Sequence, residues 1–408
     1  MSSGETVWFR GRMERLGDAF DLLATYAERG FFFERNRLGV ATSGPAVGRV
    51  PPSAADRTLS DIDRSIRGGG RTIAVGALPF LGTAAPTSML SVAAHAVRRT
   101  APGETVRIDI GEVDDATTTS PMLPASAPNE PFARAQLQEV PDAGTYADRV
   151  ATVVEGIRAG ELRKVVLART IEVTAGRRLD ARRLAHRLRA VNPDAYTFAA
   201  PTSTGMLVGA SPELLVSRFG REVRSNPLAG SAPRSGDPTE DRGNAERLRS
   251  SAKDHEEHAI VVEAIAQTLG PLCRDLSWDP EPVLLETPNV WHLSTRFRGL
   301  LREPMPSALE LALALHPTPA IGGEPRAAAL EVIEELEGFD RGMYAGPVGW
   351  TDASGDGEWA IALRCAELRG ERAILYAGAG IVAGSEPTAE LDETDRKFRA
   401  FLDALRWG

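Results

Sequence analysis

The stretch MLVGASPELLVSRFGREVRSNPLAG, residues 206 to 230, reads as two strands joined by a turn. Apolar residues dominate 206 to 219, Gly220 makes the turn, and 222 to 230 returns along the first strand. Strands joined by so short a connection pair antiparallel. The segment therefore predicts an antiparallel hairpin near the middle of the chain.

Helices and further strands are expected on both sides of this hairpin. Residues 146 to 159 and 181 to 191 have helical spacing, and the apolar strand KVVLAR, 164 to 169, lies between them. A long helix is expected to begin near Asp241 or Ser251. This mixture predicts an α+β or mixed-sheet fold in which helices cover large antiparallel sheets.

The first part of the chain has strand signals of its own. Residues 72 to 80 and 105 to 113 read as strands, and the apolar stretch around 89 to 97 reads as a helix between them. The glycine triplet at 68 to 70 lacks the lysine of a phosphate loop, so a flexible turn is expected there.

A stretch rich in Thr, Ser, Pro and Ala, residues 114 to 131, has no helical or strand periodicity. It predicts a linker or a long surface loop. The chain is therefore expected to divide into an N-terminal portion, residues 1 to 130, and a larger domain, residues 140 to 408.

The composition predicts a globular protein that acts on a small molecule. Of 408 residues, 42% are apolar and 25% are charged, and the formal net charge is −9. Nucleic acids and anionic membranes normally require a concentrated basic surface, so neither is an expected partner. The sequence has no run of about 18 apolar residues to span a bilayer and no apolar signal core at its start.

The two cysteines, Cys273 and Cys365, are far apart and lack any CxxC or Cys/His spacing. Neither a disulfide framework nor a zinc site is expected. The reducing cytoplasm is the expected compartment.

Glu257 heads a mostly apolar helical stripe that continues through Val261, Ala264, Ile265 and Thr268. A carboxylate that faces a core is costly unless it meets a cation, hydrogen-bond donors or a metal. The alternative is that Glu257 lies at the margin of the stripe and contacts water. The spacing alone leaves both interpretations open.

A second acidic helix is expected over 385 to 405, where Glu390, Glu393 and Lys397 form one ridge. Periodicity favours a solvated face with a Glu393–Lys397 pair, which would stabilise the helix by only about 0.3–0.5 kcal/mol. Metal ligation is the other interpretation, because Mg²⁺ is bound through one or two carboxylates together with water and substrate oxygens.

Lys164 and Glu213 are candidates for acid–base chemistry. Lys164 opens an apolar strand, so its amine either lies at the edge of a dry site or extends into solvent. Glu213 follows Pro212 in GASPELLV and is either a buried acid with a raised pKa or an ordinary charge on an edge strand.

Taken together, ordered blocks from roughly Tyr146 to Leu405 resemble the chorismate-utilising enzymes. This family includes isochorismate synthases, salicylate synthases and the synthase subunits of anthranilate and aminodeoxychorismate formation. So many blocks in order are a strong signal, unlike any single block. The blocks are KVVLAR (164–169), GASPELL (209–215), PLAGSAPR (227–234), SAKDHEEH (251–258), WHLSTRF (291–297), LHPTPAIGGEP (315–325), YAGPVGW (344–350), GEWAIALRCAEL (357–368) and YAGAGIVAGSEPTAELDETDRK (376–397).

The resemblance implies the fold of that family, with residues 1 to 130 completing the sheets. It also implies a Mg²⁺ cofactor, held directly by Glu257 and Glu393 and through waters by Glu390 and Asp254. The metal would clamp the ring carboxylate of chorismate.

By the same resemblance, Gly230 and Ser231 would donate hydrogen bonds to the ring carboxylate. Arg364 and the backbone at Gly378 would hold the enolpyruvyl carboxylate, which suits a guanidinium fork. Lys397 would add a cation near the bound dianion. His292 would contribute a hydrogen bond in the pocket, although a lone histidine on a strand is more often structural.

The implied reaction is attack of water at ring C2 with loss of the C4 hydroxyl. Lys164 would take the proton of the attacking water, and protonated Glu213 would donate to the departing hydroxyl. No organic cofactor is implied. The product would enter the biosynthesis of menaquinone, of a siderophore or of another salicylate-derived metabolite.

Two features favour an isochorismate synthase within the family. The ammonia-using relatives resemble one another in carrying Gln at the position of Lys164, and salicylate synthases tend to have Thr-Ala where this chain has Ala320 and Ile321. By the resemblance, Ala320, Ile321, Tyr344 and Leu363 would all bind the substrate, but Tyr344 and Leu363 do not discriminate between the two groups. A salicylate synthase and a catalytically silent chorismate-binding protein remain alternatives. No glutaminase subunit is expected, and a monomer is the default.

Overall fold

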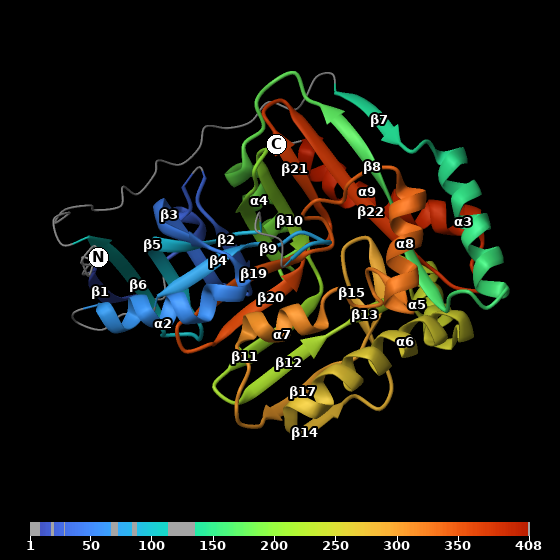
Figure 1. Cartoon of the computed structure of the whole chain (residues 1–408). Helices are drawn as coiled ribbons and strands as arrows, with labels where there is room; N and C mark the ends of the chain where they lie inside the picture. The colour runs from blue at the N-terminus through green and yellow to red at the C-terminus, as the bar shows by residue number, and fades with distance from the viewer. Residues whose placement is uncertain are drawn as a thin grey trace, which may run out of the picture.

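The computed structural model describes residues 9–17, 20–27, 29–66, 72–83, 88–112 and 135–406. In these ranges the protein contains a 19-stranded sheet, a three-stranded sheet, and helices packed around both (Figure 1). Every pairing between described strands is antiparallel. The expected α+β fold with large antiparallel sheets is confirmed.

The helices, in chain order, are α1 Leu22–Thr25, η1 Pro52–Ala54, α2 Ala55–Ser65, α3 Ala143–Arg158, α4 Ala181–Val191, α5 Pro238–Ser250, α6 Ala252–Leu269, η2 Gly270–Leu272, α7 Ala308–Leu315, α8 Arg326–Glu337 and α9 Pro387–Arg406. The strands before residue 230 are β1 Phe9–Leu16, β2 Phe32–Arg35, β3 Leu38–Val50, β4 Ile73–Ala77, β5 Leu90–Arg99, β6 Thr105–Glu112, β7 Gln136–Val140, β8 Lys164–Thr174, β9 Tyr196–Pro201, β10 Met206–Ser211, β11 Leu214–Phe219, β12 Glu222–Asn226 and β13 Leu228–Pro233. The later strands are β14 Cys273–Trp278, β15 Val283–Glu286, β16 Val290–Ser294, β17 Phe297–Leu301, β18 Gly323–Glu324, β19 Pro347–Asp352, β20 Gly357–Ile361, β21 Cys365–Arg369 and β22 Arg372–Ile381.

The long strands β8 and β22 lie side by side, although they are far apart in the sequence (Figure 1). Their register places Ile381 opposite Val165 and Gly378 opposite Ala168. Helix α8 packs on β8, and α9 packs on β22 and on α3. The pair therefore brings two separate sequence blocks, 164–169 and 376–397, to one place.

The hairpin at 206 to 230 is more divided than the sequence predicts. Its first strand breaks at Pro212, so that β10 pairs with β9 and β21 while β11 pairs with β12 and β20. Proline has no N–H to donate to a ladder, which explains the break. The returning segment also divides, because β12 stays in the large sheet while β13 joins β16 in the small one.

The helix expected from Asp241 or Ser251 is two helices. α5 ends at Ser250, and Ser251 caps α6 by accepting a hydrogen bond from the Asp254 backbone N–H. A Ser side chain that satisfies a free N–H at a helix start favours a new helix over continuation.

The expected helix at 89 to 97 is wrong, because this stretch forms most of β5. β5 is buried along nearly its whole length and pairs with β3, β4 and β6. A short apolar run does not distinguish a buried strand from a buried helix by its periodicity. The strands expected at 72–80 and 105–113 form as β4 and β6.

N-terminal strands hydrogen-bond directly to strands of the later chain. β2 pairs with β9, and β4 pairs with β19. The glycine triplet 68–70 and the stretch 114–131 lie outside the described residues. The division into residues 1–130 and 140–408 therefore stays a prediction.

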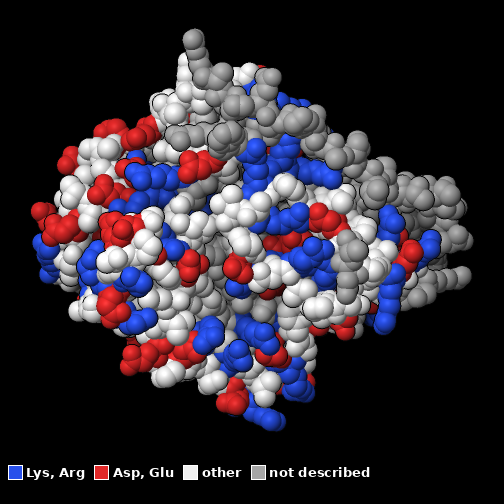
Figure 2. Space-filling view, turned by 180° about the vertical axis from the view of Figure 1, so that it is seen from behind, with Lys and Arg blue, Asp and Glu red and all other residues white. Residues whose placement is uncertain are grey.

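In the described part of the chain, no helix is long and apolar enough to cross a membrane. On the face drawn in Figure 2, basic and acidic side chains are interspersed, in keeping with 47 basic and 56 acidic residues in the chain.

A buried ion pair between Arg341 and Glu337, the last residue of α8, attaches this helix to β8. The Arg341 guanidinium donates to Glu337 Oε2 at 2.8 Å and to the backbone carbonyls of Val166 and Ile321, each at 2.8 Å. Glu337 accepts from the Ala168 N–H at 2.7 Å. The pair therefore links β8 to the loop that carries Ile321.

Replacing Arg341 with methionine should lower the free energy of unfolding by about 3–5 kcal/mol, because Glu337 would stay buried without its cation. Urea denaturation followed by circular dichroism measures this loss. The matched control is Arg221→Met, which breaks a 2.7 Å pair with Glu303 whose side chains are 57% and 60% exposed. That control should lose less than about 1 kcal/mol. Equal losses in the two variants would contradict the supporting role of Arg341.

Candidate active site

A pocket with about 690 Å³ of free space lies where β8, β13, β16, β22, α6 and α9 meet. The predicted site residues that line it are Glu213, Gly230, Ser231, Glu257, His292, Ala320, Ile321, Tyr344, Leu363, Arg364, Gly378, Glu393 and Lys397.

Glu213 lies at the break between β10 and β11 and is 3% exposed. Its Oε1 accepts a hydrogen bond from the Leu228 backbone N–H at 3.4 Å. Burial raises the pKa of its carboxyl from 4.5 to about 8. Glu213 is therefore a buried acid that holds its proton at neutral pH, and the interpretation as an edge-strand charge is wrong.

Lys164, the first residue of β8, is fully buried. Its Nζ lies 2.9 Å from Glu257 Oε1, and it has no hydrogen bond of good geometry among the described residues. The interpretation that this side chain extends into solvent is wrong.

Glu257 is 8% exposed on α6, so it faces the core and meets a cation. The carboxylates of the predicted ridge on α9 also meet cations. Glu390 is 2% exposed and lies 2.6 Å from Lys253, and Glu393 lies 2.5 Å from Lys397. The ridge is therefore not a solvated face.

The pKa values of the two glutamates of α9 shift in opposite directions. Burial, with the charge of Glu393, raises the pKa of Glu390 to about 7. Burial alone would also raise the pKa of Glu393, but the ammonium of Lys397 outweighs it and holds that pKa below its ordinary value. Ser231 adds a hydrogen bond to the Glu393 carboxylate.

Four carboxylates, Glu257, Glu390, Glu393 and Asp254, gather at this end of the pocket. Burial raises the pKa of Asp254, and the nearby charges of Glu257 and Glu393 raise it further. Such crowded carboxylates offer the oxygen donors that Mg²⁺ prefers. Among the described residues, however, no three His, Cys, Asp or Glu side chains are already arranged as a metal site.

β13 and β16 place Ser231 opposite His292. His292 Nε2 accepts a hydrogen bond from Arg364 Nη2 at 3.1 Å. Burial, and then the Arg364 charge, lower the pKa of His292 to about 3, so the ring is neutral at physiological pH. Gly230 has φ +77°, and a Cβ there would lie 2.9 Å from Asp254 Cβ, so the close approach of β13 to α6 requires glycine.

Arg364 has φ +49°, a conformation that is costly for a residue with a Cβ. It makes no ion pair among the described residues, so its charge is free to meet an anion. The Gly378 carbonyl accepts from Lys397 Nζ at 2.8 Å, and a Cβ at Gly378 would lie 3.1 Å from Tyr344 Oη. These cationic and small residues leave room for a carboxylate.

Three predicted residues do not line the pocket. Lys164 lies behind Glu257, Glu390 is paired with Lys253, and Asp254 packs against Gly230. The residues that line the pocket but were not predicted are Val166, Pro212, Leu228, Ala229, Ala345, Tyr376, Ala377 and Gly380.

Gly380 is the most informative of the residues that were missed. A Cβ there would lie 2.1 Å from Glu257 Oε1 and 3.1 Å from Lys164 Cε, so only glycine admits this ion pair. Its spacing of two from Gly378 on a strand places both on one face, which is a signal the sequence contains. Lys253 was also missed, because periodicity gives no sign that it reaches Glu390.

The fold and the site together define a chorismate-binding enzyme. Residues 92–406 match the family described as chorismate binding enzyme, and the chain belongs to that family. It is 36% identical over 400 residues to isochorismate synthase EntC of Escherichia coli K12, covering 94% of this chain and 96% of that one. It is 48% identical over 276 residues to isochorismate synthase DhbC of Bacillus subtilis, covering 66% of this chain and 69% of that one.

A solved structure has the same architecture. The menaquinone-specific isochorismate synthase MenF of Escherichia coli superposes with a TM-score of 0.83 at 26% identity, covering 98% of this chain and 95% of that one.

Glu213→Gln should remove a pH-dependent part of the stability. A carboxyl whose pKa is raised from 4.5 to about 8 on folding stabilises the fold fully below about pH 4.5, and this contribution is lost as the pH rises through about 8. The difference in free energy of unfolding between wild type and variant should therefore fall steadily over this range. Urea titrations at several pH values measure it, and a difference that stays constant would contradict the raised pKa.

Proposed function

We propose that this protein is a magnesium-dependent isochorismate synthase, which interconverts chorismate and isochorismate. One observation carries the proposal. The pocket is lined by Glu213, a protonated acid, and by Glu257, whose carboxylate contacts the buried amine of Lys164 on the side away from the lining. A protonated acid in the pocket with a buried amine close by suits a reaction that removes one hydroxyl and adds another.

In the forward direction, water attacks ring C2, the ring double bond shifts, and the C4–O bond breaks. In this proposal Lys164 first gives up its own proton and then, as the free amine, takes a proton from the attacking water. Glu213 gives its proton to the departing C4 hydroxyl, which leaves as water. Lys164 takes up one proton and Glu213 releases one, so atoms and charge balance.

Cations and hydrogen-bond donors of the pocket would hold the substrate dianion. In the part of the chain that the structure describes, Arg364 has no carboxylate partner, which supports its role on the enolpyruvyl carboxylate, with the backbone at Gly378 beside it. Gly230 and Ser231 would donate to the ring carboxylate. Neutral His292 orients the Arg364 guanidinium through its 3.1 Å hydrogen bond, and Lys397 adds positive charge.

Glu257 and Glu393 would hold Mg²⁺ directly, with Glu390 and Asp254 assisting through waters. When bound, the ion would neutralise and orient the ring carboxylate. The oxygen-only donor set and the mutual repulsion of these acids support this assignment. The lysines now paired with Glu257, Glu390 and Glu393 provide alternative counter-charges.

Within the family, Lys164 supports water rather than ammonia as the nucleophile, so no glutaminase subunit is required. Ala320 and Ile321 line the pocket and support release of isochorismate without a second, pyruvate-eliminating step. We further propose that the enzyme works as a monomer in the cytoplasm, where Cys273 and Cys365, both buried and free, stay reduced.

The purified protein, incubated with chorismate and Mg²⁺, should accumulate isochorismate, detected by chromatography with mass detection. A chelator should abolish the product. Glu213→Gln, which keeps the shape of the side chain but cannot donate the proton, should lose at least about 100-fold in kcat while still binding chorismate. Salicylate and pyruvate in place of isochorismate would instead identify a salicylate synthase, and binding without turnover would identify a silent binder.

Glu257→Gln and Glu393→Gln should each raise the Mg²⁺ concentration for half-maximal activity by about 10- to 100-fold or more. Isothermal titration calorimetry should show the same loss of Mg²⁺ affinity. Glu256→Gln is the matched control, because Glu256 is the exposed neighbour of Glu257 on α6. A magnesium titration that is unchanged in both variants would rule out this metal assignment.

A further inference from the structure

A second pocket, with about 920 Å³ of free space, adjoins the candidate active site. The two pockets share Pro212 and Arg364 as wall residues. Apart from Arg364, no residue that we assign to catalysis, metal binding or substrate binding lines the second pocket. It is therefore a separate cavity in contact with the first through one functional side chain.

The walls combine apolar surface with two guanidinium groups. Leu188, Ala195, Leu285 and Phe401 supply apolar side chains, and Arg35 and Arg364 supply the cations. Asp194 and Glu286 also line the pocket, and the charge of Asp194 acts on Arg35. Arg35 is half-buried and donates to the Asp194 carbonyl at 2.8 Å and to Tyr196 Oη at 3.0 Å, so its position is fixed. Apolar walls with a few placed cations select a flat hydrophobic ligand that carries an anionic group.

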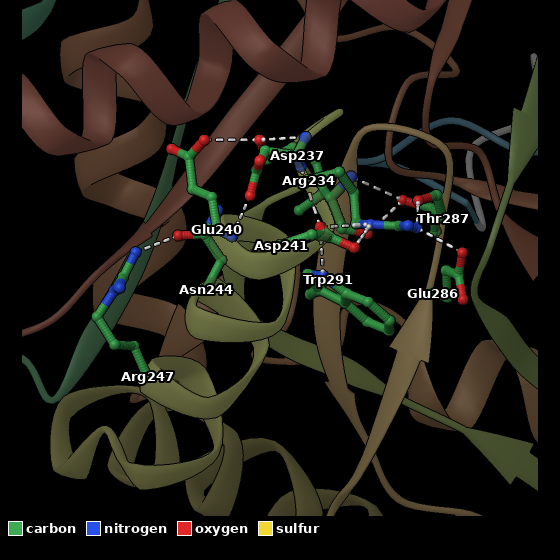
Figure 3. A network of polar contacts seen from close by, with 11 residues as sticks. Arg234, Asp237, Glu240, Asp241, Asn244, Arg247, Glu286, Thr287 and Trp291 are labelled. Carbon is green, nitrogen blue, oxygen red and sulfur yellow. Dashed lines mark hydrogen bonds and ion pairs between the residues drawn. The ribbon is translucent and has the colours of Figure 1, made fainter.

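The turn between β15 and β16, residues 286 to 289, forms one wall and is held by Arg234 (Figure 3). Arg234 Nη1 donates to Glu286 Oε1 at 2.6 Å and to the Thr287 carbonyl at 3.0 Å, and its backbone N–H donates to the Asn289 carbonyl at 3.1 Å. This wall is therefore formed before any ligand arrives.

Arg234 is itself fixed from the other side. Its Nε donates to Asp241 Oδ1 at 2.9 Å, Trp291 Nε1 donates to the same oxygen at 3.0 Å, and the guanidinium lies 4.4 Å from the Trp291 ring centroid (Figure 3). Glu286 already has its cation in Arg234. Its charge is thus compensated and opposes an anionic ligand only weakly.

We propose that the second pocket binds a small aromatic carboxylate, with its ring among the apolar side chains and its carboxylate on Arg364. Because Arg364 has one guanidinium for both pockets, such a ligand competes with the substrate carboxylate without entering the active site. The inference rests on the proposed function only through this role of Arg364. It makes the second pocket an inhibitory site for benzoate-like acids.

Salicylate is a suitable probe, because its own fluorescence reports binding without any turnover. Wild-type protein should bind salicylate, and salicylate should inhibit competitively against chorismate. Ala195→Phe, which fills the second pocket, should weaken salicylate binding at least tenfold and leave the KM for chorismate within twofold. Arg35→Met should weaken salicylate binding to a similar extent, and Arg35→Lys should restore part of it.

The outcomes separate this proposal from the proposed function. Salicylate binding that is unchanged in Ala195→Phe would place the probe in the active site and overturn the proposal. A parallel loss of kcat/KM for chorismate in Ala195→Phe would show that the second pocket is the substrate's entrance, which also overturns it. If chorismate is not converted at all, the proposed function fails, while the fluorescence titrations still decide the second pocket.

Discussion

The burial of the ion pair between Lys164 and Glu257 is the constraint on which the rest of the site depends. Two charges removed from water remain stable only if they meet each other and further polar groups. Their 2.9 Å contact joins the first residue of β8 to α6, and it fits only because Gly380 on the neighbouring strand has no side chain. The same rule governs Glu390 with Lys253 and Glu393 with Lys397. One end of the pocket is thus a cluster of compensated charges, and this permits carboxylates to face a core.

Environment, rather than residue type, assigns the chemical roles. Glu213, which is buried, and Glu393, which is partly buried, line one pocket, but only Glu393 of the two has an ammonium within ion-pair distance. Burial therefore dominates at Glu213 and keeps its proton on, whereas Lys397 keeps Glu393 ionised. A neutral His292 follows from the same balance, since burial and Arg364 both oppose its charge. The pocket therefore contains one protonated and one ionised carboxyl group.

The antiparallel sheets make this arrangement possible because they bring distant segments into register. β8 and β22 align the blocks that contain Lys164 and Gly378, and β13 with β16 sets Ser231 against His292. Arg341 holds β8 through the Val166 carbonyl, and Arg234 holds the turn before β16 through the Thr287 carbonyl. Both arginines act on backbone carbonyls, so they hold main-chain geometry and not only side chains.

The sequence by itself determined the fold class, the family and most of the residues that line the pocket, because local blocks and their order carry that information. It also predicted the individual helices at 146–159 and 181–191, where amphipathic spacing is strong. It did not distinguish the β5 strand from a helix, and it pointed to Pro212 and Ser251 without showing that the strand is interrupted at the first and that a second helix begins after the other, since short apolar runs and capping depend on neighbours. Whether Glu257, Lys164 and Glu390 face solvent or core was open in the sequence. Only the tertiary structure decided it, because burial and charge pairing are set by segments that lie far apart in the chain.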